Sequence, residues 1–110
     1  MDLRQLRAFQ EVAREGSFTR AAKNLHYSQP TVTAQIRCLE DALGTQLLVR
    51  RGGRAVELTD AGLLLRPYAD RILALVEAAR RDIRTAAAGD SRPIARGRPG
   101  RERPRERPGV

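Results

Sequence analysis

Three short apolar patterns at helical spacing follow one another over residues 1–44, and each is bounded by residues that start or stop helices. Residues 3–15 place apolar side chains on one helical face, and Gly16 is suited to end that helix in a left-handed conformation. Ser17 and Ser28 are suited to cap the two following helices, because a serine hydroxyl accepts a hydrogen bond from an unpaired backbone amide. The pattern predicts a mainly α-helical domain that begins with three short helices.

The third of these helices is predicted to begin at Gln29 and to be closed by Gly44. Pro30 fits its first turn, where backbone amides have no partner within the helix. Because Glu40 and Asp41 lie near its C-terminal end, we expect only the N-terminal half to suit a phosphate-rich surface. The apolar stripe consists of Val32, Ile36, Leu39 and Leu43, and the opposite side of Pro30, Ala34, Arg37 and Asp41, with Gln29 and Thr33 at its flank.

Two short β-prone runs, residues 47–50 and 55–58, flank a pair of glycines at positions 52 and 53. This pattern predicts a β-hairpin, because glycine readily adopts the backbone conformations that tight turns need. The residues expected at its tip are Arg50, Arg51 and Arg54.

A fourth helix is predicted over residues 59–88, with Thr59 as its capping residue. Pro67 lies inside it and is expected to kink the helix or to leave a backbone carbonyl unpaired. Its apolar residues recur at steps of three and four over more turns than a small core can cover, so part of the stripe requires another partner. The stripe consists of Leu65, Tyr68, Ile72, Leu75, Ala79, Ile83 and Ala86.

The composition changes at the C-terminal end of the chain. Residues 90–110 hold seven arginines and four of the six prolines, with almost no large apolar residue to bury. We therefore expect a disordered Arg/Pro/Gly-rich tail at 89–110, after a domain at 1–58 and the long helix at 59–88.

The net charge of +8 makes a polyanion the expected partner, with nucleic acid ahead of an anionic membrane surface. The single cysteine excludes an intramolecular disulfide and a multi-cysteine zinc site, and no apolar run is long enough to span a bilayer. These features predict a soluble cytoplasmic protein that does not enter the membrane. Cys38 itself is interpreted as a small semi-buried apolar residue.

The sequence has no catalytic triad, phosphate-binding loop or paired carboxylates, so we do not expect an enzyme. His26 is interpreted as a turn residue, since no second histidine or acidic cluster accompanies it. We expect no metal and no cofactor.

Three helices followed by a hairpin form the winged helix-turn-helix plan, with the helix-turn-helix at residues 18–37. DNA binding is therefore the first hypothesis. Residues 1–62 closely resemble the N-terminal domain of LysR-type transcriptional regulators, through the strings LRQLRAF, EGSFTRAAKNLHYSQPTVTAQIRCLE, QLLVR and VELTDAG. The sequence departs from the family pattern at Ala34, where arginine is common, and at Leu48, where phenylalanine is common.

The resemblance implies that the third helix enters the major groove of double-stranded DNA and that the hairpin is a wing on the neighbouring backbone or minor groove. Residues implied to face base edges are Gln29, Pro30 and Thr33, those implied to hold phosphates are Thr31 and Arg37, and those implied on the wing are Arg50 and Arg54. Without the surrounding motif, Gln29, Ser28 and Thr33 would be interpreted as ordinary capping and surface residues.

The fourth helix resembles the family's linker helix, which implies a homodimer through residues 59–88 and a roughly palindromic DNA site. The residues implied in the dimer contact are Leu65, Tyr68, Ile72, Leu75, Ala79 and Ile83. Family members continue past this helix into a domain that binds a small-molecule effector. We expect this chain to be a regulator that is truncated before that domain. We therefore expect that no small-molecule effector binds to this chain. In a second hypothesis the folded part is only a dimerising module, and the arginine-rich tail binds nucleic acid without sequence preference.

Overall fold

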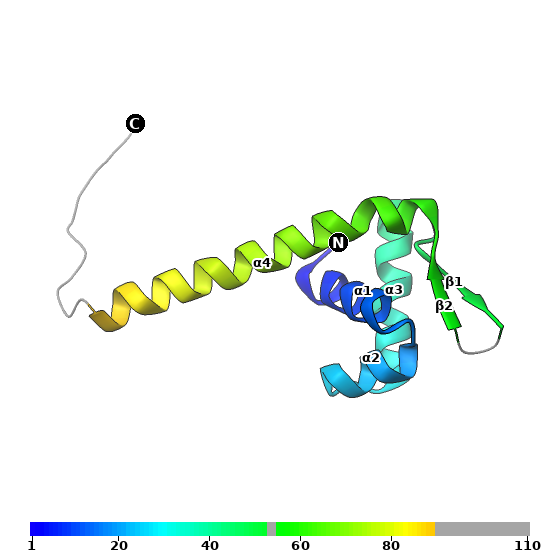
Figure 1. The fold of residues 1–110 in the computed structure, drawn as a ribbon, viewed down its shortest axis with the longest axis horizontal. Coiled ribbons are helices and arrows are strands. Elements are labelled where there is room, and N and C mark those ends of the chain that lie inside the picture. The colour runs from blue at the N-terminus through cyan, green and yellow to red at the C-terminus, as the bar shows by residue number, and fades with distance from the viewer. Residues whose placement is uncertain (53–54, 90–110) are drawn as a thin grey trace. The chain divides into compact units, whose positions relative to one another are not determined.

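The computed structural model describes residues 1–52 and 55–89, which contain helices and one hairpin (Figure 1). This confirms the predicted winged helix-turn-helix fold with a long additional helix. The chain divides into two compact units, Met1–Glu77 and a second that begins at Ala78, so the first unit includes the N-terminal part of the long helix. The elements in chain order are α1 (Leu3–Glu15), α2 (Phe18–Leu25), α3 (Gln29–Leu43), β1 (Leu48–Arg51), β2 (Ala55–Leu58) and α4 (Asp60–Gly89).

The predicted helix ends are confirmed. Gly16, His26 and Gly44 follow α1, α2 and α3 with φ values of 66°, 60° and 71°, all in the left-handed region. The Ser17 and Ser28 hydroxyls accept from the backbone amides three residues later, at 3.1 and 3.2 Å. These caps make the two connections of the helix-turn-helix short and fixed.

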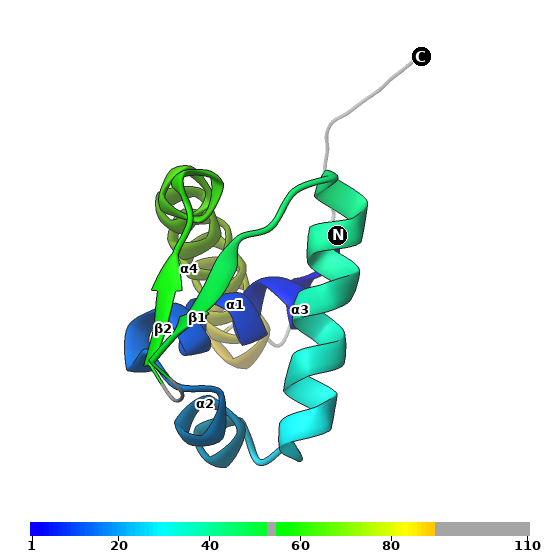
Figure 2. The same cartoon turned by 90° about the vertical axis from the view of Figure 1, so that its right-hand side faces the viewer.

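The core of the first unit lies where α1 meets both α2 and α3 (Figure 2). Large side chains from α1, α3 and the start of the hairpin are completely enclosed there, and each contributes about 1.5–3 kcal/mol through burial. These side chains are Phe9, Val12, Val32, Leu39 and Leu47. The apolar stripe predicted for α3 therefore faces the core, except Leu43, which is 40% exposed.

The hairpin corrects one prediction about its arginines. β1 and β2 are antiparallel with Arg50 opposite Val56 and Arg51 opposite Ala55, so Arg50 and Arg51 lie in β1 and not at the tip. The prediction was wrong because strand pairing continues one residue beyond position 50, up to a turn that Gly52 enters with φ of 52°. Arg54, the third arginine predicted at the tip, lies outside the described residues.

One backbone hydrogen bond joins the hairpin to the end of α1, and another continues the strand pairing one residue beyond β1 and β2. The Val56 amide donates to the Gly16 carbonyl at 3.2 Å, and the Thr59 amide donates to the Leu47 carbonyl at 3.0 Å. Thr59 also caps α4, since its hydroxyl oxygen accepts from the Gly62 amide at 3.1 Å. A Cβ at Gly62 would lie 2.2 Å from the Leu47 carbonyl oxygen, so this close approach of α4 to the hairpin needs glycine.

α4 is one helix from Asp60 to Gly89 and continues through Pro67. Gly89 ends this helix instead of beginning the predicted tail, and the rest of that predicted tail lies outside the described residues. Among the residues that the structure describes, no helix is both long enough and apolar enough to cross a bilayer.

The predicted apolar stripe of α4 has two kinds of member. Leu65 and Ile72 are half-buried and pack against the core, beside the fully enclosed Ala69 and Leu73. Tyr68, Leu75 and Ile83 are instead 59%, 71% and 69% exposed, and Ala79 is exposed as well. Leu64, which the predicted stripe omitted, is 71% exposed.

Glu11 is the charged side chain that is buried within the described part of the chain, and it joins α1 to α2. Its carboxylate accepts from Asn24 Nδ2 at 2.7 Å and from the guanidinium of Arg14. Burial by itself raises the pKa of Glu11, but the hydrogen bonds from Asn24 and Arg14 and the charge of Arg14 together outweigh burial, so the pKa is lowered. The carboxylate is therefore stabilised in its charged form by folding.

Replacing Glu11 by glutamine is expected to destabilise the protein by roughly 1–2 kcal/mol at pH 7, since a charged acceptor in a buried network is lost. A lowered pKa in the folded state gives stability above the unfolded value of about 4.3 that is lost as the pH falls through the folded value. The difference in the free energy of unfolding between wild type and Glu11→Gln should therefore decrease as the pH is lowered. Urea unfolding at a series of pH values, followed by circular dichroism, measures this difference.

Glu15→Gln is the control for this prediction, because Glu15 also accepts from Asn24, at 2.8 Å, but is more exposed. We expect a smaller effect from this control. A wild-type advantage over Glu11→Gln that stays constant down to pH 2.5 would contradict the explanation.

Candidate nucleic-acid interface

The side of α3 that faces away from the core forms a shallow groove of about 580 Å³. Pro30 and Ala34 have short side chains, so the surface is recessed at their positions, while Gln29 and Arg37 supply hydrogen-bond donors. The groove is lined by Gln29, Pro30, Thr33, Ala34, Arg37, Cys38 and Asp41. The structure therefore brings four of the predicted site residues, Gln29, Pro30, Thr33 and Arg37, onto one helical surface.

Two predictions about this surface need correction. Cys38 is exposed, and not semi-buried, because it follows Arg37 on the outer side of the helix, one position before the buried Leu39. Glu40 is half-buried and hydrogen-bonded to the start of β1, so of the two acidic residues at the C-terminal end only Asp41 lines the groove.

Thr31 lies at the N-terminal end of α3 and belongs to its cap. Its hydroxyl is 2.8 Å from the Ser28 hydroxyl, and its backbone amide donates to the same oxygen at 3.2 Å. Gln29 is held differently, since its Oε1 accepts from the hydroxyl of Thr19 in α2 at 3.2 Å. The predicted site omitted Thr19, because its contact with Gln29 depends on how the two helices cross.

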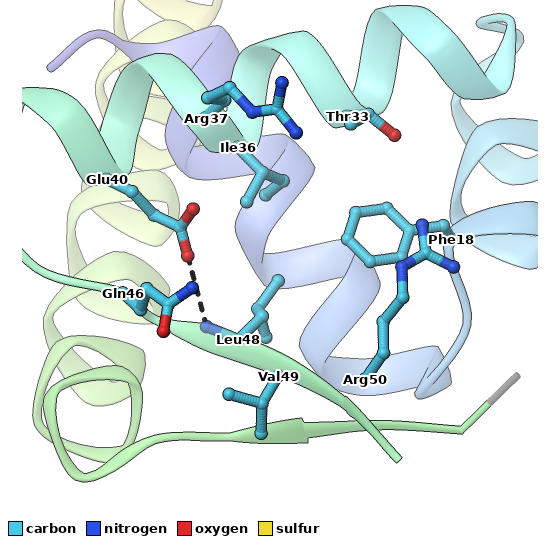
Figure 3. Close-up of a pocket in the computed structure, with 9 residues that line it drawn as sticks. All are labelled: Phe18, Thr33, Ile36, Arg37, Glu40, Gln46, Leu48, Val49 and Arg50. Atoms are coloured by element: carbon cyan, nitrogen blue, oxygen red, sulfur yellow. Dashed lines mark hydrogen bonds between the residues drawn. The ribbon is translucent and has the colours of Figure 1, made fainter. Parts of the chain in front are cut away.

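A second hollow, of about 380 Å³, lies between α3 and the hairpin (Figure 3). Thr33 and Arg37 line it from α3, and Arg50 lines it from β1. Both arginines are exposed, so two positive charges from different elements border the same hollow, which the half-buried Glu40 also lines. Such an arrangement suits a phosphate group or another anion.

Arg50 lies against an aromatic ring from the helix-turn-helix. Its guanidinium carbon is 4.5 Å from the centroid of the Phe18 ring, at the beginning of α2 (Figure 3). An aromatic face attracts a guanidinium while leaving its N–H donors able to make hydrogen bonds. The predicted site omitted Phe18, whose place in an apolar stripe indicated only a core residue.

Glu40 sets the spacing between α3 and the wing. Its Oε2 accepts from the backbone amide of Leu47 at 2.8 Å. The same oxygen accepts from the backbone amide of Leu48 at 3.3 Å (Figure 3). The Leu47 amide directly precedes β1 and the Leu48 amide begins it, so the side chain of Glu40 holds the start of β1 against α3. On the outer part of the hairpin, the charge of Arg51 is compensated by Glu57 at 3.2 Å.

The described ranges hold no group of three or more His, Cys, Asp and Glu side chains close enough together to bind a metal ion. The surface described above offers three kinds of chemical group. These are amide and hydroxyl groups for hydrogen bonding, small apolar residues for close contact and arginines for negative charge.

A three-helix core with an exposed third helix and a hairpin beside it defines a winged helix-turn-helix protein. The family model described as "Bacterial regulatory helix-turn-helix protein, lysR family" matches residues 3–63. The chain therefore belongs to the LysR family of bacterial regulators, which is a family of transcriptional regulators and not of enzymes.

The chain is similar to two curated relatives over most of its own length. It is 52% identical over 89 residues to the transcriptional regulator BudR of Klebsiella aerogenes, which covers 81% of this chain and 62% of BudR. It is 51% identical over 77 residues to a probable cat1 operon transcriptional activator of Acinetobacter lwoffii, which covers 70% of this chain and 25% of the activator. The chain thus spans less than two thirds of the length of these relatives.

Solved structures give the same family. The BenM DNA-binding domain in complex with catB site 1 DNA is 41% identical with a TM-score of 0.75, and the match covers 82% of this chain and all of that domain. The regulator CbnR is 45% identical with a TM-score of 0.73, and the match covers 79% of this chain and 30% of CbnR.

Replacing Glu40 by alanine is expected to lower the free energy of unfolding by about 1–3 kcal/mol, because two backbone amides lose their shared acceptor. Glu40→Gln keeps an acceptor oxygen and should lose less. Thermal or urea unfolding measures both variants.

Asp41→Ala is the matched control, because it removes an exposed carboxylate from the next position of the same helix. If Glu40→Ala and Asp41→Ala destabilise the protein equally, the carboxylate of Glu40 does not hold the wing as described.

Proposed function

We propose that this protein is a sequence-specific DNA-binding regulator of transcription in which α3 enters the major groove and the hairpin lies on the adjoining backbone. The observation that carries the proposal is the hollow shared by Thr33 and Arg37 of α3 with Arg50 of the wing. Through this hollow, two arginine side chains lie beside the exposed surface of α3, a helix that the major groove of DNA can accommodate. The BenM domain and CbnR, to which the chain is similar, have been crystallised with DNA, which supports the proposal.

The N-terminal half of α3 supplies the contacts to base edges. Gln29 offers amide donors, Pro30 offers an apolar contact to a thymine methyl group, and Thr33 offers a hydroxyl. Ala34 leaves room for a close approach of the backbone to the bases. These contacts give sequence preference, since base edges in the major groove differ in their donors, acceptors and methyl groups.

The backbone contacts supply affinity and position. Arg37 holds a phosphate from α3, and Arg50 holds one from the wing while Phe18 supports its guanidinium. Thr31 contributes through the N-terminal cap of α3, where backbone amides and the helix dipole favour a phosphate. Arg54 is proposed to extend the wing's contact with the backbone or a narrow minor groove.

We also propose that the protein acts as a homodimer through the outer surface of α4. This proposal is supported by apolar residues that are exposed at helical spacing on α4, because monomeric proteins rarely expose a long apolar stripe to solvent. These residues are Tyr68, Leu75, Ala79 and Ile83. Leu64 extends the same side of the helix by one turn. A two-fold dimer would bind two half-sites of a roughly palindromic sequence, in the cytoplasm where bacterial DNA lies.

The double variant Gln29→Ala with Thr33→Ala is expected to lose about 10- to 100-fold in affinity for a preferred duplex, because base contacts are removed. Affinity for a scrambled duplex should change little, since the phosphate contacts are kept. Fluorescence anisotropy with both duplexes measures the ratio.

The control for this prediction is Gln35→Ala with Thr45→Ala, which removes the same two side-chain types from positions outside the groove. Equal loss of affinity for both duplexes in the Gln29/Thr33 variant would refute a base-reading role for α3.

Leu75→Glu is expected to shift the protein from dimer to monomer, because it puts a charge into the proposed apolar contact between two copies of α4. Analytical ultracentrifugation over a range of concentrations measures the dissociation constant, which we expect to rise at least tenfold. Leu43→Glu is the control, as it places the same charge on a partly exposed leucine at the end of α3. A dimer that is unaffected by Leu75→Glu would exclude this surface as the interface.

A further inference from the structure

The side chain of Gln29 is held from outside its own helix before any DNA is bound. Thr19, the second residue of α2, donates from its hydroxyl to Gln29 Oε1 at 3.2 Å. The two residues lie ten positions apart on different helices, and both side chains are exposed. Figure 2 shows α2 beside the N-terminal end of α3, where this hydrogen bond is made.

The hydrogen bond between Thr19 and Gln29 lies where two surface depressions meet. Gln29 lines the α3 groove and also a hollow of about 750 Å³ beside α2, which it shares with Thr19, Arg20 and Arg50. The glutamine thus sits where the helix surface that faces base edges meets the surface that faces the phosphate backbone. The direction in which its amide points decides which of the two it contacts.

A glutamine on an exposed helix surface has three rotatable bonds beyond its Cα atom, so many orientations of its amide compete. A contact that fixes one orientation in the free protein lowers the entropy that is lost on binding. In the orientation seen here, the amide oxygen is turned toward α2 and the NH2 group keeps its two donor hydrogens.

We propose that Thr19 is a specificity-determining positioning residue, which holds the Gln29 amide so that its NH2 group is directed to a hydrogen-bond acceptor on a base edge. Acceptors of this kind in the major groove are guanine O6, purine N7 and thymine O4. Thr19 touches no base in this proposal and acts through Gln29. The inference rests on the proposed function, because it requires that α3 reads DNA.

Within the part of the chain that the structure describes, the hydrogen bond made by the Thr19 hydroxyl is the one to Gln29. The cap of α2 is supplied by Ser17, whose hydroxyl oxygen accepts from the Arg20 amide at 3.1 Å. The side chain of Thr19 is exposed, so removing its hydroxyl leaves the core intact. A change in base preference on substitution would therefore report on Gln29 and not on folding.

The test is binding selection from a random duplex library with the full chain, carried out on wild type, Thr19→Val and Thr19→Ser. Thr19→Val keeps the shape without the hydroxyl, and discrimination at one position of each half-site is expected to fall about three- to tenfold. Thr19→Ser keeps the hydroxyl and should keep the wild-type preference. Thr45→Val is the matched control, because it makes the same substitution at an exposed threonine that lines neither the α3 groove nor the hollow shared by Thr19 and Gln29.

Two further variants show whether Thr19 acts through Gln29. In a Gln29→Ala background, Thr19→Val should cause no additional change in preference, as expected when both act in one contact. Gln29→Glu keeps an oxygen for Thr19 but has no donor, so preference at that position should move toward a base that offers a donor, adenine N6 or cytosine N4.

Specific outcomes overturn the inference. If Thr19→Val weakens binding to all sequences equally, or if it changes preference as much in the Gln29→Ala background, Thr19 does not position Gln29. If Gln29→Glu keeps the wild-type preference, the amide donor is not the reading group. If the wild-type chain itself selects no motif, the proposed function fails, and this result is distinct from the others.

Discussion

The structure depends on the burial of one side of α3 against α1. Val32, Ile36 and Leu39 are enclosed, and each is stabilised by about 1.5–3 kcal/mol through loss of contact with water. In an α-helix, residues at steps of three and four share a side, so enclosing these three turns the opposite side outward. The outward position of the groove formed by Gln29, Pro30 and Ala34 is therefore a consequence of core packing.

The wing is attached to the helices by polar contacts as well as by apolar residues such as Leu47 and Leu48, which are buried in the core. Glu40 binds the two amides that begin β1, Gly16 accepts from β2, and Phe18 supports Arg50. The contacts join the hairpin to α3, to the end of α1 and to α2, so Arg50, which borders the hollow from β1, is held by all three helices and not by the hairpin alone. A two-stranded hairpin by itself is only marginally stable in water, which explains why these attachments matter.

Local patterns predict much of this protein from its sequence. The ends of α1, α2 and α3 follow from single residues such as Gly16, Ser17 and Ser28, because capping needs only neighbours in the chain. Helical spacing likewise predicts which side of α3 is exposed.

The sequence does not predict the contacts that depend on how elements cross. The roles of Thr19, Phe18 and Glu40 arise from hydrogen bonds or ring contacts between elements, and the place of Arg50 depends on a strand register shifted by one residue. In α4, periodicity alone did not separate Leu65, which packs on the core, from Leu75, an exposed member of the same predicted stripe.

We propose that the folded part of the chain, and not its arginine-rich end, recognises DNA. Selection from a random duplex library at near-physiological salt, with the full chain and with residues 1–88 alone, tests this claim most directly. The account predicts that both enrich the same partly palindromic motif. Binding that is sensitive to salt, selects no motif and is lost when residues 89–110 are removed would contradict it.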